Sequence, residues 1–141
     1  MPDRTVHRFR VRYAECDHQG VVFNGHYLAY FDLGLTELWR AALGSYRAML
    51  DGGHDLVVVE ATVRYRHPAR FEDEVDLETR ITAFGTTSMT VGNRLTRAPD
   101  GELLAEGDLA YVFVDRAGAK TPVPEWIRAA LGPGVGPQAV H

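Results

Sequence analysis

The sequence is poor in several features that mark other classes of protein. Its 141 residues include one cysteine, Cys16, so an internal disulfide and a thiolate-rich zinc site are both excluded. Such low cysteine use is typical of a reducing compartment. No segment approaches the ~18 consecutive apolar residues that cross a bilayer, and Met-Pro-Asp-Arg-Thr at the N-terminus lacks the apolar core of a signal peptide. We therefore expect a cytoplasmic protein that does not contact a membrane.

Excess basic charge and nucleotide-binding motifs are also missing. The formal net charge is −4 and the isoelectric point is near 5.8, which argues against a nucleic-acid partner because such partners need a basic face. Neither a Gly-x-Ser-x-Gly nucleophile elbow nor a P-loop occurs. His18 and His26 are too far apart for the spacing of ligands on a zinc-binding helix. We expect no metal ion.

What the sequence does contain is the composition of an ordinary globular domain, with 45% apolar and 24% charged residues. The length suits one hydrophobic core and is too short for two comfortable domains. We expect a single domain over residues 1–131. Residues 132–141 are rich in glycine and proline and are predicted to form a flexible tail.

One long segment, residues 24–43, carries apolar side chains around most of its helical circumference, which predicts a helix that other elements enclose. Asn24 is a suitable N-cap, and Gly44 suits the position after the last helical residue. Residues 45–55 are interpreted as a short helical turn and a loop. A second helix is predicted over residues 124–131, with proline at its start.

Five segments show the alternation of apolar and polar residues that is typical of strands: residues 6–13 before the helix, and residues 56–67, 75–84, 89–96 and 103–115 after it. In the second of them the odd positions from Val57 to Tyr65 are apolar and are expected to face the helix. Short connections force neighbouring strands to run antiparallel. The predicted fold class is α+β, a five-stranded antiparallel sheet wrapped around one long buried helix.

The segment from Tyr13 to Tyr27 is the strongest candidate for an active site. A strand leads there into an acidic, glycine-containing turn and then into the long helix. The first turn of a helix has unpaired N–H groups and about half a positive charge, so it can hold a carbonyl oxygen that becomes negative. Asp17 would then be the base or the nucleophile. The alternative is that Asp17 only shapes the turn, since aspartate is common before helices.

The neighbours of Asp17 have simpler interpretations. Cys16 is interpreted as a small buried residue rather than a nucleophile, because no base is paired with it. Glu15 could raise the pKa of Asp17 by like-charge repulsion, although we expect Glu15 to be solvated. A basic cluster farther along the chain is either a solvated strand face or a contact for phosphate groups; its members are Arg64, Arg66, His67 and Arg70.

The order of elements resembles the hotdog fold. The motif Tyr13-Ala-Glu-Cys-Asp17-His-Gln-Gly20-Val-Val-Phe-Asn24-Gly-His-Tyr27-Leu-Ala-Tyr-Phe-Asp32 resembles the 4-hydroxybenzoyl-CoA thioesterase family, in its broad bacterial acyl-CoA thioesterase branch. The segments Tyr65-Arg-His-Pro-Ala-Arg70-Phe-Glu-Asp73 and Pro124-Glu-Trp126 extend the match to nearly the full chain. The motif is specific for this branch but not for one substrate.

The resemblance implies that Asp17 is the catalytic carboxylate and that the backbone N–H of Asn24 or Gly25 polarises the thioester carbonyl. It also implies a homodimer or homotetramer with each site at a subunit boundary, and coenzyme A as part of the substrate with no separate cofactor. The residues expected to bind substrate are Gly20, Val21, His26 and Tyr27, and those expected to contact the phosphates of coenzyme A are Arg66 and Arg70.

Two positions depart from the aromatic-specific members of the family, which have tyrosine in place of Asn24 and proline in place of His18. The departure argues against 4-hydroxybenzoyl-CoA as the substrate. His26 fits a surface position as well as a pocket wall, and Tyr27 fits the core of the helix equally well.

The predicted function is hydrolysis of the thioester bond of an acyl-CoA or acyl carrier to a free carboxylic acid and a thiol. One alternative is a non-catalytic acyl-CoA-binding module, which would not need Asp17. The other is a hotdog enoyl-CoA hydratase, which would need a histidine paired with the aspartate.

Overall fold

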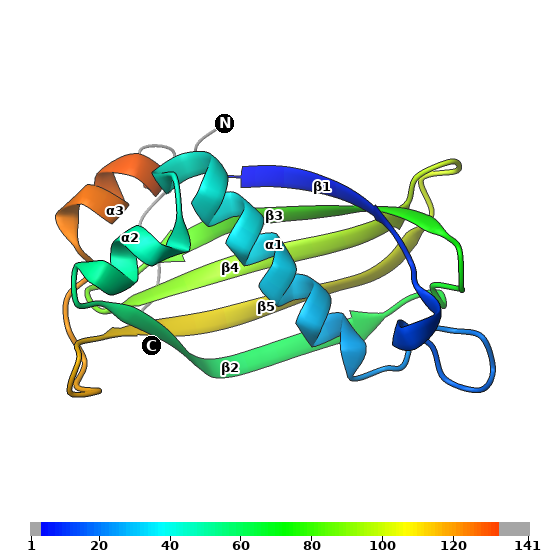
Figure 1. Cartoon of the computed structure of the whole chain (residues 1–141), viewed down its shortest axis with the longest axis horizontal. Coiled ribbons are helices and arrows are strands. Elements are labelled where there is room, and N and C mark those ends of the chain that lie inside the picture. Colours follow the sequence, from blue (N-terminus) through cyan, green and yellow to red (C-terminus); the bar gives the residue numbers. More distant parts are fainter. Residues whose placement is uncertain (1–3, 133–141) are drawn as a thin grey trace.

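The computed structural model describes residues 4–132, which form one antiparallel sheet with a long helix across it (Figure 1). The strand order in the sheet is β1-β3-β4-β5-β2, and the predicted α+β architecture is confirmed. In these residues no helix is both long and apolar enough to cross a membrane. The strands are β1 (Arg4–Arg10), β2 (Asp55–Tyr65), β3 (Glu74–Phe84), β4 (Ser88–Arg97) and β5 (Leu103–Val114), and the helices are η1 (Tyr13–Glu15, a 3-10 turn), α1 (His26–Leu43), α2 (Tyr46–Asp51) and α3 (Glu125–Leu131).

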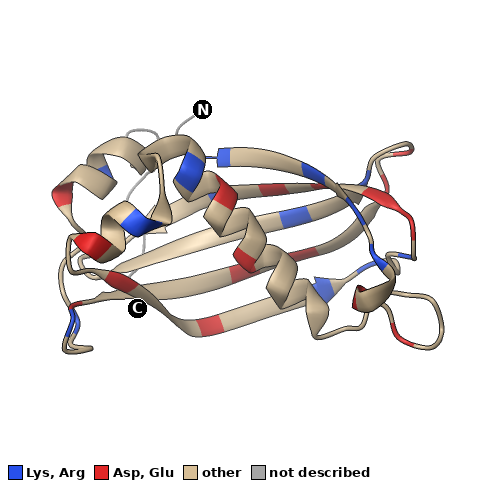
Figure 2. Cartoon of the chain, viewed as in Figure 1, with Lys and Arg blue, Asp and Glu red and all other residues tan. Residues whose placement is uncertain are grey.

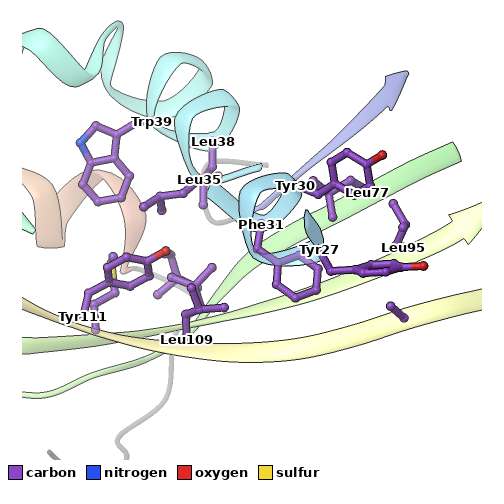
Figure 3. Packing of buried hydrophobic residues seen from close by; sticks show 14 of the residues in the cluster. Tyr27, Tyr30, Phe31, Leu35, Leu38, Trp39, Leu77, Leu95, Leu109 and Tyr111 are labelled. Carbon is purple, nitrogen blue, oxygen red and sulfur yellow. The ribbon is translucent and has the colours of Figure 1, made fainter. Parts of the chain in front are cut away.

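The core lies between α1 and the concave face of the sheet (Figure 3). Aromatic and leucine side chains that recur every three or four residues along α1 form the buried stripe. Close approach of α1 to β3 depends on Gly34, because a Cβ atom there would clash with Oγ1 of Thr79. The sheet covers only one side of α1, and Leu28, Ala29 and Asp32 remain on its exposed side.

Strand β2 forms one edge of the sheet and pairs only with β5, while β1 forms the other edge and pairs with β3. The consecutive strands β2 and β3 are therefore not neighbours. A bulge between Val58 and Glu60 shifts the register of β2, and Val57, Val58 and Val59 are 47%, 46% and 52% exposed. The expectation that the odd residues of this strand are covered by the helix is wrong, because the bulge breaks the alternation and α1 lies nearer to β1 and β3.

Two predicted boundaries near the candidate site need correction. Strand β1 ends at Arg10, and Tyr13 begins the 3-10 turn with its side chain 79% exposed. Helix α1 begins at His26 with Gly25 as its N-cap, so the assignment of Asn24 as N-cap is wrong. Gly44 ends the helix as predicted, with φ of 85° and its N–H bonded to the carbonyl oxygen of Arg40.

The last helix, α3, starts directly after Pro124 as predicted. The tail predicted for residues 132–141 lies outside the described residues apart from Gly132.

Candidate active site

Asp17 lies at the start of a tight loop, residues 16–22, between the 3-10 turn and α1. Cys16 and Val22 close the loop as an antiparallel bridge. Inside it the Asp17 N–H donates to the carbonyl oxygen of Val21 at 2.9 Å, and the Gly20 N–H donates to the carbonyl oxygen of Asp17 at 3.0 Å. Gly20 has φ of 78°, a conformation that glycine adopts without strain. The loop therefore holds Asp17 in a defined place.

The two oxygens of the Asp17 carboxylate have different surroundings. Oδ1 accepts a 2.8 Å hydrogen bond from the backbone N–H of Gln19, which is the Asx turn that aspartate commonly makes. Oδ2 has no hydrogen bond or ion pair within residues 4–132. The side chain is half-buried. One oxygen therefore shapes the turn while the other is open to a ligand or to water.

The start of α1 offers free backbone donors. Over the described part of the chain, the N–H groups of Asn24 and Gly25 donate to no acceptor, as expected for amides before the first helical turn. The carbonyl oxygen of Asn24 accepts a 2.8 Å hydrogen bond from the hydroxyl of Tyr65 at the end of β2. Sequence reasoning gave Tyr65 no role here, although it begins one of the segments that resemble the thioesterase family.

Tyr27 is a core residue that also supports a second loop, residues 68–73. Its ring is buried and lies edge-on to Tyr65 at 5.3 Å, and its hydroxyl accepts a 3.3 Å hydrogen bond from the N–H of Ala69. Burial raises the pKa of Tyr27. Arg70 forms a bridge with Val21. Val21 thus contacts both Asp17 and Arg70, and Tyr27 contacts the 68–73 loop that carries Arg70.

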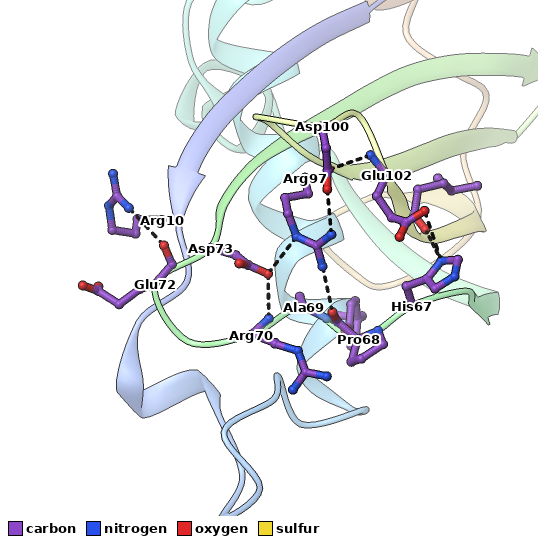
Figure 4. A network of polar contacts seen from close by, with 12 residues as sticks. Arg10, His67, Pro68, Ala69, Arg70, Glu72, Asp73, Arg97, Asp100 and Glu102 are labelled. Carbon is purple, nitrogen blue, oxygen red and sulfur yellow. Dashed lines mark hydrogen bonds and ion pairs between the residues drawn. The ribbon is translucent and has the colours of Figure 1, made fainter.

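Arg97 braces the 68–73 loop from β4 (Figure 4). Its guanidinium contacts Asp73 at 3.3 Å, Asp100 at 3.2 Å and the carbonyl oxygen of Pro68 at 3.5 Å. The same Asp73 carboxylate accepts the backbone N–H of Arg70 at 2.9 Å. The guanidinium of Arg70 points away from this network and has no ion pair within residues 4–132. It is available to an anionic ligand.

Most of the remaining basic cluster is paired with acidic residues; Figure 2 marks the basic positions of the chain in blue and the acidic positions in red. Nε and Nη2 of Arg66 donate to Glu106 at 3.1 and 2.9 Å, and Arg64 pairs with Asp108 at 3.2 Å. Gly107 between these two acids packs against Phe31 of α1, so the acids point away from the helix. Arg64 and Arg66 therefore occupy the outer face of the sheet, where each is paired with an acid.

Glu15 differs from the expected solvated residue. Its side chain is only 5% exposed and is held by Arg12 and by the hydroxyl of Tyr30, both within 2.9 Å. The expectation failed because the sequence does not show that the 3-10 turn points Glu15 inward, towards α1. The spacing of Arg12 and Glu15, three residues apart, is the one local signal for their pairing.

His26 lines a cavity of about 710 Å³ between β1 and α1, on the side of the helix away from Tyr65. Its ring lies edge-on to Tyr30 at 5.1 Å. Asp17 does not line this cavity. The other lining residues include Phe9, Arg12, Glu15, Tyr30 and Leu33.

Cys16 is half-buried, and its Sγ atom lies 3.6 Å from the carbonyl oxygen of Arg12. Burial raises the pKa of the thiol, and the negative charges of Glu15 and Asp17 raise it further. The thiol therefore stays protonated at neutral pH, which agrees with its interpretation as a packing residue rather than a nucleophile.

Comparison with known proteins decides the family. Residues 11–131 match the model of the thioesterase-like superfamily. The chain belongs to this superfamily. It is 34% identical to the acyl-CoA thioester hydrolase YbgC of Escherichia coli O6:H1 over 106 residues, which are 75% of this chain and 78% of that protein. The predicted family and enzyme class, those of a thioester hydrolase, are confirmed.

Solved structures confirm the hotdog fold. A hypothetical protein, TT1821 from Thermus thermophilus, superposes with a TM-score of 0.83 at 31% identity and covers 91% of this chain and 95% of its own. The 1,4-dihydroxy-2-naphthoyl-CoA thioesterase Slr0204 from Synechocystis superposes with a TM-score of 0.83 at 21% identity, covering 93% of this chain and 97% of its own. This superfamily member therefore has the predicted five-stranded antiparallel sheet with its helix across one face.

Proposed function

We propose that this chain hydrolyses the thioester bond of an acyl-CoA or acyl carrier, with Asp17 as the reacting carboxylate and the start of α1 as the oxyanion-binding site. The observation that carries the proposal is the open Oδ2 of Asp17, on the loop that leads into α1, together with the free N–H groups of Asn24 and Gly25 just before that helix. Relatives named as acyl-CoA thioester hydrolases support this choice of substrate.

In the proposed reaction, the thioester carbonyl oxygen accepts hydrogen bonds from the N–H groups of Asn24 and Gly25. Those fixed donors stabilise the negative charge that develops when the carbonyl carbon is attacked. Asp17 either removes a proton from the attacking water or attacks the carbon itself, giving a mixed anhydride that water then hydrolyses. In both routes the carbon–sulfur bond breaks and the thiolate leaves. A thiol pKa of about 8.5 makes a strong general acid unnecessary.

The surroundings of Asp17 suggest how the substrate lies. Gly20 and Val21 belong to the Asp17 loop, and Tyr27 supports the neighbouring 68–73 loop through its hydrogen bond with Ala69. Arg70, which bridges to Val21, is the residue that we propose meets a phosphate group of coenzyme A. Arg66 is less suited to bind a phosphate group because its guanidinium is already paired with Glu106.

We also propose that the active form is a homodimer or a larger assembly that is joined through β2. This edge strand exposes three consecutive valines, and an uncovered apolar edge is prone to pair with another chain. At the other edge, β1 exposes Arg4, Arg8 and Arg10 together with a single valine, Val6, and charged side chains oppose such pairing. Tyr65 at the end of β2 contacts the start of α1, so a partner at this edge would border the site.

A panel of acyl-CoA esters, with thiol release followed by a chromogenic reagent, tests the activity. We expect release with at least one acyl group at a rate well above that of Asp17→Asn. The matched control is Asp115→Asn, because Oδ1 of Asp115 makes the same kind of turn contacts in an exposed loop. Binding of acyl-CoA without thiol release by the wild type would contradict hydrolysis and favour a binding module.

A further inference from the structure

Glu15 is the one charged side chain that is buried within residues 4–132. A buried charge is costly unless it is paired and hydrogen-bonded. Both of its oxygens are used. Oε1 accepts the N–H of Arg12 at 2.9 Å and the hydroxyl of Tyr30 at 2.8 Å, and Oε2 accepts Nε of Arg12 at 2.8 Å. The reaction described above gives this carboxylate no role.

The partners of Glu15 lie on both parts of the proposed site. Its side chain reaches Tyr30, which lies about one turn into α1. Its carbonyl oxygen accepts the N–H of Phe23 at 3.0 Å, just where the chain leaves the Asp17 loop and approaches the helix. Cys16 next to it closes that loop. Glu15 therefore connects the base of the Asp17 loop to α1 through its side chain and through its main chain.

The protonation states of the two groups suit this contact. Burial acts to raise the pKa of Glu15, but the hydrogen bonds from Arg12 and Tyr30 and the charge of Arg12 together lower the pKa below its ordinary value. Burial, followed by the bond to Glu15, raises the pKa of Tyr30 far above its ordinary range. At neutral pH Tyr30 keeps its proton and donates, while Glu15 is a carboxylate and accepts.

Stability alone is a weak reason to bury such a group, because buried ion pairs can often be replaced by apolar residues without loss of stability. The contacts with Arg12 are local and would hold Glu15 in its turn without Tyr30. The bond to Tyr30 adds something different, a fixed distance between the Asp17 loop and α1. Misplacement of reacting groups by about 1 Å can lower a rate ~10²-fold.

We propose that Glu15 is a positioning residue, which through Tyr30 holds the Asp17 loop where the carboxylate and the free amides of Asn24 and Gly25 reach the same thioester carbonyl. The inference rests on the proposed role of Asp17 in hydrolysis. In this role Glu15 acts through Tyr30 and not by contact with the reacting atoms.

Tyr30→Phe tests this role, because it removes the hydroxyl and keeps the ring. The matched control is Thr79→Val, which removes another buried hydrogen bond beneath α1, the 3.0 Å bond to Asn93. Each change is made in the wild type and in Asp17→Asn. In the wild type we expect Tyr30→Phe to lower kcat about tenfold with KM within about twofold, and Thr79→Val to leave kcat unchanged.

The Asp17→Asn background separates positioning from a general loosening of the fold. If Tyr30 acts through Asp17, Tyr30→Phe changes the residual rate of Asp17→Asn by less than about twofold. A loss of the same factor in both backgrounds, or a wild-type kcat for Tyr30→Phe, overturns the positioning role and leaves the role of Asp17 intact. A wild-type kcat for Asp17→Asn overturns both.

Discussion

The hydroxyl of Tyr65, at the end of the edge strand β2, donates a 2.8 Å hydrogen bond to the carbonyl oxygen of Asn24, one residue before the N-cap of α1. The peptide group that carries this carbonyl also carries the N–H of Gly25 on its other side. The contact therefore fixes the direction of an amide that we propose binds the oxyanion. It also links the helix start to the strand through which we propose two chains associate.

Tyr65→Phe should remove this link at a modest cost in stability. One hydrogen bond contributes about 1 kcal/mol, which corresponds to a decrease in Tm of roughly 3 °C for a domain of this size. We expect kcat to fall several-fold, because the amide loses its fixed direction. Calorimetry and steady-state assays measure both effects. Tyr13→Phe is the control, since Tyr13 is exposed and its hydroxyl has no hydrogen bond within residues 4–132. If Tyr65→Phe and Tyr13→Phe change kcat and Tm equally, the hydrogen bond from Tyr65 does not support the helix start.

Stability should depend on pH through Glu15. The folded-state pKa of Glu15 is lowered, so its ionised form stabilises the fold above the unfolded value of about 4.3, and this contribution disappears as the pH falls through the folded pKa. The difference in Tm between wild type and Glu15→Gln should therefore be largest above about pH 5 and shrink on acidification. Thr79→Val removes a contact between neutral groups, so the Tm difference between wild type and Thr79→Val should not change with pH. If the Tm difference between wild type and Glu15→Gln instead grows as the pH falls, the folded-state pKa of Glu15 is not lowered and this prediction is wrong.

Arg70→Ala should raise KM for acyl-CoA several-fold and leave kcat near the wild-type value, because it removes binding that is equal in the ground and transition states. Added salt should raise KM of the wild type more than that of the variant. Arg47→Ala on α2 is the control, since it removes an exposed charge at the other end of α1. If KM responds neither to Arg70→Ala nor to salt, the Arg70 guanidinium is only a solvated charge.

Light scattering at micromolar concentration should give at least twice the monomer mass. Val58→Lys should shift the protein towards the monomer, because a charge on β2 opposes edge pairing. Val6→Lys is a matched control on the opposite edge, where Val6 is 59% exposed, and it should leave the mass unchanged. A monomeric wild type, or loss of the assembly with Val6→Lys but not with Val58→Lys, would contradict association through β2.

Much of the fold could be predicted because local signals agree with the tertiary structure. Gly44 ends α1, Ser45 caps α2 by accepting the N–H of Ala48, and Gly101 closes the turn between β4 and β5. The bulge after Val58 could not be predicted, because pairing with β5 sets the register of β2 and the alternation of its own residues does not. The strand order also depends on contacts between distant segments.

The local structure around the candidate site could be predicted where neighbours in sequence form it, and could not where α1 contributes. Asp17 and Gly20 share one loop, as the turn residues of the motif indicate. Glu15 was misjudged because its burial depends on Tyr30, fifteen residues farther along the chain. The residue type of Asn24 favours an N-cap, whereas the structure has Gly25 in that position and Tyr65 of β2 bonded to the Asn24 carbonyl.

The most direct test is the turnover of Asp17→Asn. Asparagine keeps the shape of the side chain and an oxygen that can accept the N–H of Gln19, but it can neither take a proton from water nor attack a carbonyl. General-base assistance contributes ~10²–10⁴-fold, so kcat on the best acyl-CoA should fall at least ~10²-fold while Tm stays the same or rises. Asp115→Asn should keep its full activity. If purified, folded Asp17→Asn hydrolyses that ester at the wild-type kcat, Asp17 is only a turn residue and the proposed mechanism is wrong.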